Sequence, residues 1–161
     1  MSDDAFYSSP CMMVDTDPAY HGFLTKEEIV ELLSTLLRAE RAGVRICVLS
    51  RQDAPSHRHR RLLRDIQRDE AASCRGLMES VKILGATPDK AVGDFAEKCL
   101  AIDGFDERLR FLNRGQGWVT KRIAEALPKI RHSDVQRQLA RMLDNHRRNI
   151  DSINAFLKSF D

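Results

Sequence analysis

The sequence has no apolar run near the roughly 20 residues that a membrane-spanning helix needs, and no basic-then-apolar leader at its start. It also lacks an excess of charge of one sign, because 26 Lys and Arg residues stand against 24 Asp and Glu residues and leave a net charge of +2. Such a balance gives no electrostatic argument for a nucleic-acid partner. We therefore expect a cytoplasmic chain that binds neither a membrane nor nucleic acid.

Cysteine is scarce, and its spacing argues against two common uses of this residue. The four cysteines, Cys11, Cys47, Cys74 and Cys99, form no C-x-x-C pair, as a zinc ribbon or a redox dithiol would require. The sequence also lacks a Gly-rich phosphate loop, a dinucleotide fingerprint and a nucleophile with an adjacent base. An enzyme with a standard motif is therefore disfavoured, and the thiols are expected to be reduced and mostly packed.

Apolar residues recur at helical spacing in four long stretches, which predicts an all-α chain. The expected helices run from Thr25 to about Leu49, from residues 55–56 to Gly85, from about Phe105 to before Pro128, and from Ser133 to the chain end. Capping boxes are predicted at Thr25 with Glu28 and at Ser133 with Gln136. Residues 1–24 carry no helical period and are expected to form an irregular arm ahead of one domain, residues 25–161.

The lengths of the connections predict how the four helices are arranged. The first two connect through a short loop, and so do the last two, which makes each pair antiparallel neighbours. The link between residues 85 and 105 is long enough to travel the length of a bundle. Within this crossover, Thr87-Pro88 is expected to start a short helical stretch that ends near Leu100.

One polar residue interrupts the apolar stripe of each helix near its midpoint. The four residues, in chain order, are Glu40, Glu70, Gln116 and His146. The phase that turns their apolar neighbours inward must turn these side chains inward as well. Because buried polar groups are costly unless they pair or bind a cation, the sequence predicts a polar layer inside the bundle.

These positions resemble the ferritin-like superfamily, whose di-iron members place Glu, Glu-x-x-His, Glu and Glu-x-x-His on successive helices. Three of the six ligands implied by the resemblance are present, namely Glu40, Glu70 and His146. Ser73, Gln116 and Leu143 stand at the other three positions. The resemblance therefore implies a ferritin-like four-helix bundle with a degenerate ligand set, and it disfavours di-iron oxygen chemistry. Over nearly its whole length, and most specifically at residues 111–118, the chain also resembles an uncharacterised family of small bacterial ferritin-like proteins, which implies no particular activity.

Two hypotheses account for the polar layer. In the first, Glu40, Glu70 and His146 bind one divalent metal ion (Fe, Zn or Mn), with Gln116 or water in the remaining position. Cys74, one turn beyond Glu70, could add a thiolate. In the second hypothesis, which the sequence favours, the layer is metal-free, His146 shares protons with Glu40 or Glu70, and Gln116 satisfies the remaining hydrogen bonds.

Two classes of function follow from these hypotheses. The favoured one is a binding or accessory protein, acting as a homodimer or as a subunit of a complex. The alternative is a metal-dependent oxidoreductase of the ferritin or rubrerythrin type, whose missing ligands come from Cys74, Asp69, Asn149 or a second chain. Whether the chain is an enzyme stays open.

Three further features carry structural expectations. The basic run at residues 57–61 is expected to be a solvated helix face. Gly115 and Gly117 are expected to allow another helix or the N-terminal arm to approach closely, with a pocket or a local bulge as the alternative. Trp118 is expected to pack against the crossover or a partner chain, with the wall of a ligand pocket as the alternative.

Overall fold

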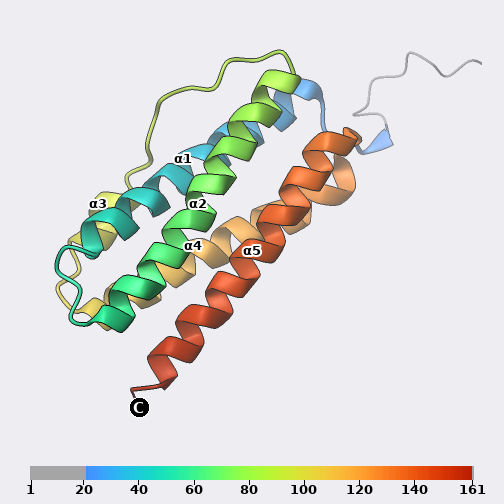
Figure 1. Cartoon of the computed structure of the whole chain (residues 1–161). Helices are drawn as coiled ribbons and strands as arrows, with labels where there is room; N and C mark the ends of the chain where they lie inside the picture. The colour runs from blue at the N-terminus through green and yellow to red at the C-terminus, as the bar shows by residue number, and fades with distance from the viewer. Residues whose placement is uncertain (1–20, 161) are drawn as a thin grey trace, which may run out of the picture.

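A computed structural model of the chain describes residues 21–160, which fold as a bundle of four long helices (Figure 1). The elements are α1 (Lys26–Ser50), α2 (His57–Ile83), α3 (Phe95–Leu100), α4 (Phe105–Ala126), the 3-10 turn η2 (Leu127–Lys129) and α5 (Ser133–Lys158). The predicted all-α fold is confirmed. None of the described helices is long and apolar enough to cross a membrane.

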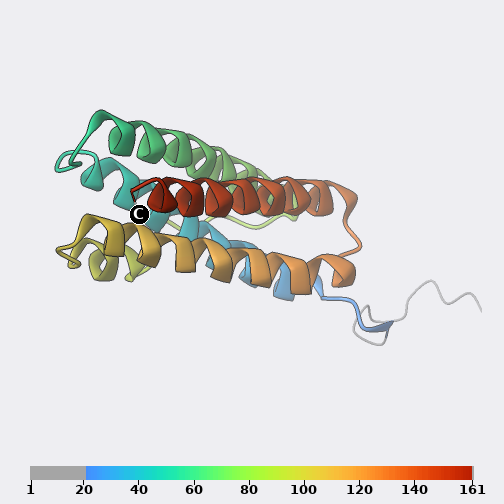
Figure 2. The same cartoon turned by 90° about the horizontal axis from the view of Figure 1, so that it is seen from below.

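The four long helices form two antiparallel pairs that lie side by side (Figure 2). Helices α1 and α2 form one pair and α4 and α5 the other, and contacts of α1 with α4 and of α2 with α5 join the pairs. The crossover after α2 returns along α1 to reach α3 (Figure 1). This connectivity is the one expected from the short and long links in the sequence.

Local signals fix several of the helix ends. The capping box at the start of α1 is present, because Thr25 Oγ1 accepts from the Glu28 backbone N–H at 3.2 Å and the Glu28 carboxylate accepts from the Thr25 N–H at 2.8 Å. After α2, Gly85 has a φ of +75°, a conformation that favours glycine. Helix α4 ends before Pro128, which cannot continue the helical hydrogen bonding.

The predicted capping box at Ser133 is wrong. Ser133 is the first residue of α5, and the cap is His132, whose side chain makes no capping hydrogen bond. The side-chain amide of Gln136 reaches backwards and donates to the Ile130 carbonyl instead. A contact with the η2 connection therefore replaces the local cap.

The short crossover helix begins at Phe95, so the prediction of a start at Thr87-Pro88 is wrong. Asp89 accepts hydrogen bonds from Arg38 at 3.0 and 2.7 Å and from Arg41 at 3.2 Å. Arg41 also donates to two backbone carbonyls of the crossover, at 3.0 and 2.7 Å. Because these long-range bonds hold the segment against α1, they override the local signal for a helix.

The predicted N-terminal arm, residues 1–24, lies outside the described residues except for residues 21–24, and Cys11 is among the residues not described. The described end of the arm is attached to the connection between α4 and α5. The Leu24 backbone N–H donates to the Lys129 carbonyl at 2.8 Å. The guanidinium of Arg131 lies 4.8 Å from the centre of the Phe23 ring.

The basic run at the start of α2 contains one buried residue, so it is not uniformly a solvated face. His59 is only 6% exposed, and its ring contacts Phe105, Phe156 and Phe160 at centroid distances of 5.0, 4.7 and 5.5 Å. His59 lies four residues before the buried Leu63, on the same face of the helix. The position of His59 on the inner face of the helix therefore decides its burial, although its neighbours in the sequence are basic and exposed.

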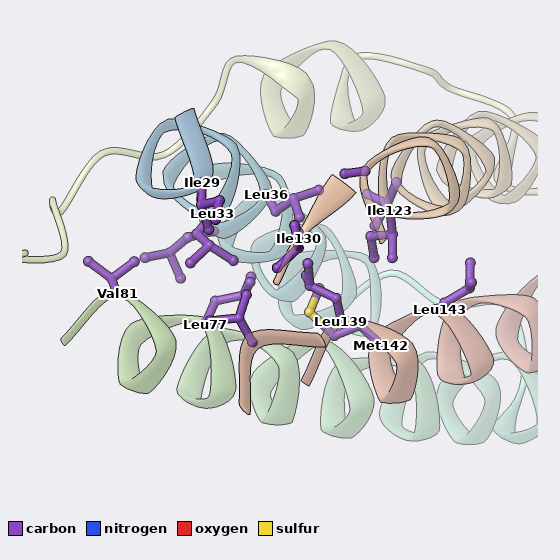
Figure 3. Packing of buried hydrophobic residues seen from close by; sticks show 14 of the residues in the cluster. Ile29, Leu33, Leu36, Leu77, Val81, Ile123, Ile130, Leu139, Met142 and Leu143 are labelled. Atoms are coloured by element: carbon purple, nitrogen blue, oxygen red, sulfur yellow. The ribbon is translucent and has the colours of Figure 1, made fainter. Parts of the chain in front are cut away.

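The apolar core is divided into two clusters by the polar residues. One cluster (Figure 3) fills the end of the bundle where α1 begins and α2 ends, and its labelled side chains are Ile29, Leu33, Leu36, Leu77, Val81, Ile123, Ile130, Leu139, Met142 and Leu143. The other fills the opposite end and consists of Ala42, Ile46, Cys47, Leu63, Ile66, Ala96, Cys99, Leu109, Leu112, Ile153 and Leu157. In sequence, each long helix passes from one cluster to the other through its predicted polar residue.

Candidate metal centre

Each long helix contributes one buried polar side chain to the middle of the bundle. Glu40 of α1 is 0% exposed, Glu70 of α2 2%, Gln116 of α4 3% and His146 of α5 1%. One ligand atom from each of Glu40, Glu70 and His146 can be chosen so that all three lie within 4.8 Å of one another. The structure thus brings together the residues that the sequence proposed as a polar layer, and this group could hold a metal ion.

Direct contacts connect the four side chains. His146 Nε2 lies 3.0 Å from Glu40 Oε1 and 3.9 Å from Glu70 Oε1. Gln116 Nε2 donates a hydrogen bond to the same Glu70 oxygen. The imidazole therefore faces both carboxylates, and the amide holds one of them in position.

A hydrogen bond to the backbone of α5 fixes the orientation of the His146 ring. Its Nδ1 lies 2.9 Å from the Met142 carbonyl oxygen, one turn earlier in α5. A carbonyl only accepts, so Nδ1 carries the hydrogen. In the neutral imidazole the lone pair is then on Nε2 and points at the carboxylates, the arrangement in which histidines usually bind metals.

Two buried acceptors of the layer have no hydrogen-bond partner among the described residues. They are Glu40 Oε2 and Gln116 Oε1. Leaving a buried polar group unpaired costs about 1–3 kcal/mol, and more for a charged one. Both atoms are acceptors, so either a cation or a hydrogen-bond donor would satisfy them.

The electrostatics favour a protonated centre in the absence of a cation. Burial and the neighbouring Glu40 carboxylate raise the pKa of Glu70 well above its ordinary value. Burial on its own would lower the pKa of His146, but the charges of Glu40 and Glu70 and the hydrogen bond to Glu40 outweigh it and raise this pKa to about 9. A metal ion entering this centre would therefore displace protons.

Gly43 provides the space for one of the carboxylates. A Cβ atom at this position would overlap the Glu70 carboxylate group. Gly43 lies three residues after Glu40 on the same buried face of α1. Its place in an apolar stripe is the sequence signal for a close approach, but the sequence does not say which group approaches.

A cavity of about 440 Å³ leads to the centre between α1 and α4 and is bordered by α3 and the residues before it. Its floor is formed by the four polar side chains. Its walls and mouth are formed by Thr35, Arg38, Ala39, Gly43, Gly93, Asp94, Phe95, Leu112, Arg114, Gly115, Trp118 and Val119. Sequence reasoning missed the part of this wall from residues 93–95, because the path of the crossover depends on tertiary contacts.

The residues beside Gln116 play different parts. A Cβ atom at Gly115 would lie 2.5 Å from the Phe95 ring, so this glycine allows another helix, α3, to approach closely, as expected. Gly117 has nothing within 4 Å of the corresponding position, so close packing does not account for it. Trp118 is 40% exposed and lines the cavity, with the Arg122 guanidinium 4.9 Å from its ring centre.

The structure does not bring Cys74 or Asp69 into the group of ligand atoms. Cys74 is half-buried and packs against the first apolar cluster, and burial raises the pKa of its thiol to about 12. Asp69 is half-buried, and its carboxylate lies 3.8 Å from Arg68.

Asn149, another alternative ligand, is more buried than a residue at the edge of the inner face. It is 6% exposed, and its Nδ2 has no hydrogen-bond partner among the described residues. Ile150, which the periodicity places in the apolar stripe, is only half-buried. At this point of α5 the buried residue is therefore Asn149, in place of the expected Ile150.

Comparison with known proteins gives a family and a fold. Residues 27–155 match a family described as "Domain of unknown function (DUF6306)", and no curated protein matches the sequence. A ferritin-like diiron-carboxylate protein from Bacillus anthracis str. Ames is similar in structure, with a TM-score of 0.74, 15% identity and coverage of 82% of this chain and 96% of that one.

Two further solved structures share the architecture. CopM in its Cu(II)-bound form has a TM-score of 0.66 and 11% identity, and the match covers 86% of this chain and 99% of CopM. A two-domain protein from Anabaena variabilis ATCC 29413, with DJ-1/ThiJ/PfpI-like and ferritin-like domains, has a TM-score of 0.69 and 12% identity. That match covers 88% of this chain and 39% of the two-domain protein. These likenesses confirm the predicted ferritin-like fold.

Proposed function

The chain belongs to the DUF6306 family, and from the geometry of its buried centre we propose that it binds one divalent metal ion through Glu40, Glu70 and His146. The observation that carries this proposal is the unpartnered Glu40 Oε2, buried in a group whose ligand atoms lie within 4.8 Å of one another. A divalent cation bound there would supply both charge compensation for the carboxylates and a Lewis acid at the floor of the cavity.

The donor set supports one ion rather than two. A dinuclear centre needs bridging carboxylates, and the layer offers only the two of Glu40 and Glu70. Serine, glutamine and leucine stand at positions 73, 116 and 143, where the di-iron pattern has ligands. One nitrogen and two carboxylate ligands suit Zn, Fe or Mn, and a Cu(II)-bound neighbour in the same fold adds copper to the ions worth testing.

The surrounding residues support this role by holding the ligands in place. The Met142 carbonyl fixes the tautomer of His146, and the Gln116 amide holds the Glu70 carboxylate. Outer contacts of this kind orient ligands and tune their affinity in known metal sites. We therefore assign Gln116 a positioning role through its Nε2, which leaves its Oε1 without a described partner.

The metal-free layer favoured by the sequence is the competing explanation. It accounts for the contact between His146 and Glu40, but it needs a proton on Glu70 to give Glu40 a second partner, and it leaves Gln116 Oε1 unsatisfied. A metal ion would compensate the charge of both carboxylates without that proton. For this reason we propose a metal-binding role in place of a purely structural one.

Calorimetric titration of chelator-treated, untagged protein with Zn²⁺, Mn²⁺, Fe²⁺ and Cu²⁺ tests the proposal. We expect one ion per chain for at least one metal, with proton release. His146→Gln should abolish this binding, and His132→Gln, at the half-buried cap of α5, is the matched control that should keep it. Equal binding by both variants would overturn the proposed ligand set.

A further inference from the structure

The cavity above the centre combines an apolar wall with a polar floor. Its wall includes Leu112, Val119, Phe95 and Trp118, and its floor includes the three proposed ligands. Its volume of about 440 Å³ falls within the roughly 300–1,000 Å³ typical of small-molecule sites. A small organic molecule can therefore lie between the bundle surface and the metal centre.

We propose that this cavity binds a small monocarboxylate with an aromatic or branched aliphatic body, whose carboxylate completes the coordination of the ion. This inference rests on the proposed function. Three protein ligands leave at least one position open on a four-coordinate ion, and the cavity is the approach to the ligands Glu40, Glu70 and His146. A carboxylate oxygen is a suitable donor for the ions that this N/O ligand set favours.

The shape of the wall supports a ligand with a flat or branched apolar body. The Phe95 ring comes from the crossover, and Gly115 lets it approach α4 closely. The Trp118 ring comes from α4 itself, lines the cavity and is 40% exposed, with the Arg122 guanidinium 4.9 Å from its centre. Aromatic rings stack on such surfaces with offset or edge-on geometry.

The charges along the cavity support an anionic head group. Arg38 and Arg114 both line it. Arg38 is paired with Asp89 at 2.7 Å, whereas Arg114 lies over the Phe111 ring at 5.1 Å and has no ion pair with a described carboxylate. The one acid above the floor, Asp94, is paired with Lys98 at 2.7 Å. Of the charged residues that line the outer cavity, Arg114 therefore keeps an uncompensated positive charge, which attracts an anion toward the centre.

The single tryptophan of the chain makes the cavity directly observable. Because Trp118 is the only Trp and lines the cavity, its fluorescence reports on occupation of this site. Protein loaded with Co²⁺ adds a second signal, since the visible absorption bands of Co²⁺ change when a new ligand coordinates. The probe is phenylacetate, and phenethylamine and 2-phenylethanol are controls with the same ring and a cationic or neutral head.

Phenylacetate should change both the Trp118 emission and the Co²⁺ bands along the same saturation curve, and should bind at least about tenfold more weakly without Co²⁺. The amine and the alcohol should bind at least about tenfold more weakly than phenylacetate. Equal binding of all three probes would overturn the inference. So would an emission change without a change in the Co²⁺ bands, because the ligand would then fail to reach the ion.

Two cavity variants test the location. Ala39→Leu and Thr35→Leu each add bulk to the wall, and they should weaken phenylacetate binding at least about tenfold while one Co²⁺ still binds. Ala140→Leu makes the same exchange on the exposed face of α5 and should change neither. Failure of Co²⁺ to bind wild-type protein would overturn the proposed metal site and this inference together. Normal Co²⁺ binding without a response to phenylacetate would overturn this inference alone.

Discussion

Replacing Glu70 with Gln separates the cost of burying the carboxylate from its value as a ligand. The side chain is 2% exposed, and its pKa is raised by burial and by the charge of Glu40. At a pH above the ordinary pKa of a glutamate, folding of the metal-free protein must therefore either keep a proton on Glu70 or bury a second negative charge beside Glu40. Glu70→Gln keeps the shape, still accepts from Gln116 and removes this cost, so the metal-free variant should be at least as stable as wild type at pH 8.

The same variant should lose most of the stabilisation that metal gives. A ligand present at 100 times its dissociation constant stabilises a protein by about 2.7 kcal/mol. For a chain of this size, 1 kcal/mol shifts the midpoint of thermal unfolding by roughly 2–4 °C. Wild type should therefore gain about 5–10 °C from saturating metal, and Glu70→Gln should gain only a small part of this.

The assay is thermal unfolding followed by circular dichroism at pH 8, with chelator and then with the metal that binds most tightly in calorimetry. Glu79→Gln, on the exposed face of the same helix, is the matched control and should behave as wild type in both conditions. The reasoning is refuted if Glu70→Gln unfolds well below wild type in chelator. It is also refuted if metal raises the midpoints of Glu70→Gln and wild type equally.

The remaining predictions concern the proton content of the centre and the space around it. In metal-free protein, the proton on His146 stabilises the fold fully below pH 6.5, because the pKa of this side chain is raised to about 9 in the folded state. This stabilisation should be lost as the pH rises through about 9. The free energy of unfolding in urea, measured from pH 6 to 10, tests this prediction. Gly43→Ala should destabilise the protein by about 1–3 kcal/mol and weaken metal binding, because the added methyl group overlaps the Glu70 carboxylate. Gly117→Ala meets nothing within 4 Å and should stabilise α4 by up to about 1 kcal/mol without changing metal binding.

Each of these predictions has a result that would contradict it. A stability that rises between pH 6.5 and 9 would show that His146 does not hold a proton in the folded state. Metal binding by Gly43→Ala at wild-type affinity would show that the space at this glycine does not position Glu70. Weakened metal binding in Gly117→Ala would place the centre closer to this residue than the structure does.

The long helices and the polar layer could be predicted from sequence because both depend on local periodicity. A 3.6-residue repeat assigns each position to the inner or outer face of a helix. The apolar neighbours of Glu40 and His146 are therefore enough to predict that both side chains point inward. The same rule, applied four residues before Leu63, would have predicted the burial of His59, which its basic neighbours concealed. Helical phase, and not the polarity of the neighbouring residues, is therefore the signal for the burial of His59.

Other features depend on contacts between distant parts of the chain and could not be predicted from sequence. The start of α3 depends on hydrogen bonds from Arg38 and Arg41 to Asp89, about 50 residues away in sequence. The cavity wall depends on where the crossover places Phe95, and the start of α5 on the reach of Gln136 to Ile130. In each case a long-range or cross-element contact replaced the local preference.

Metal content of the protein is the most direct test of the central claim. Untagged protein should be purified without added metal and analysed for its elements, beside a variant in which His146→Gln and Glu40→Gln are combined. The account predicts close to one divalent ion per chain in wild type, with X-ray absorption showing only nitrogen and oxygen ligands, and close to none in the double variant. Wild-type protein that takes up no ion even after incubation with excess Zn²⁺, Mn²⁺, Fe²⁺ or Cu²⁺ would contradict the account and leave the layer as a metal-free hydrogen-bonded network.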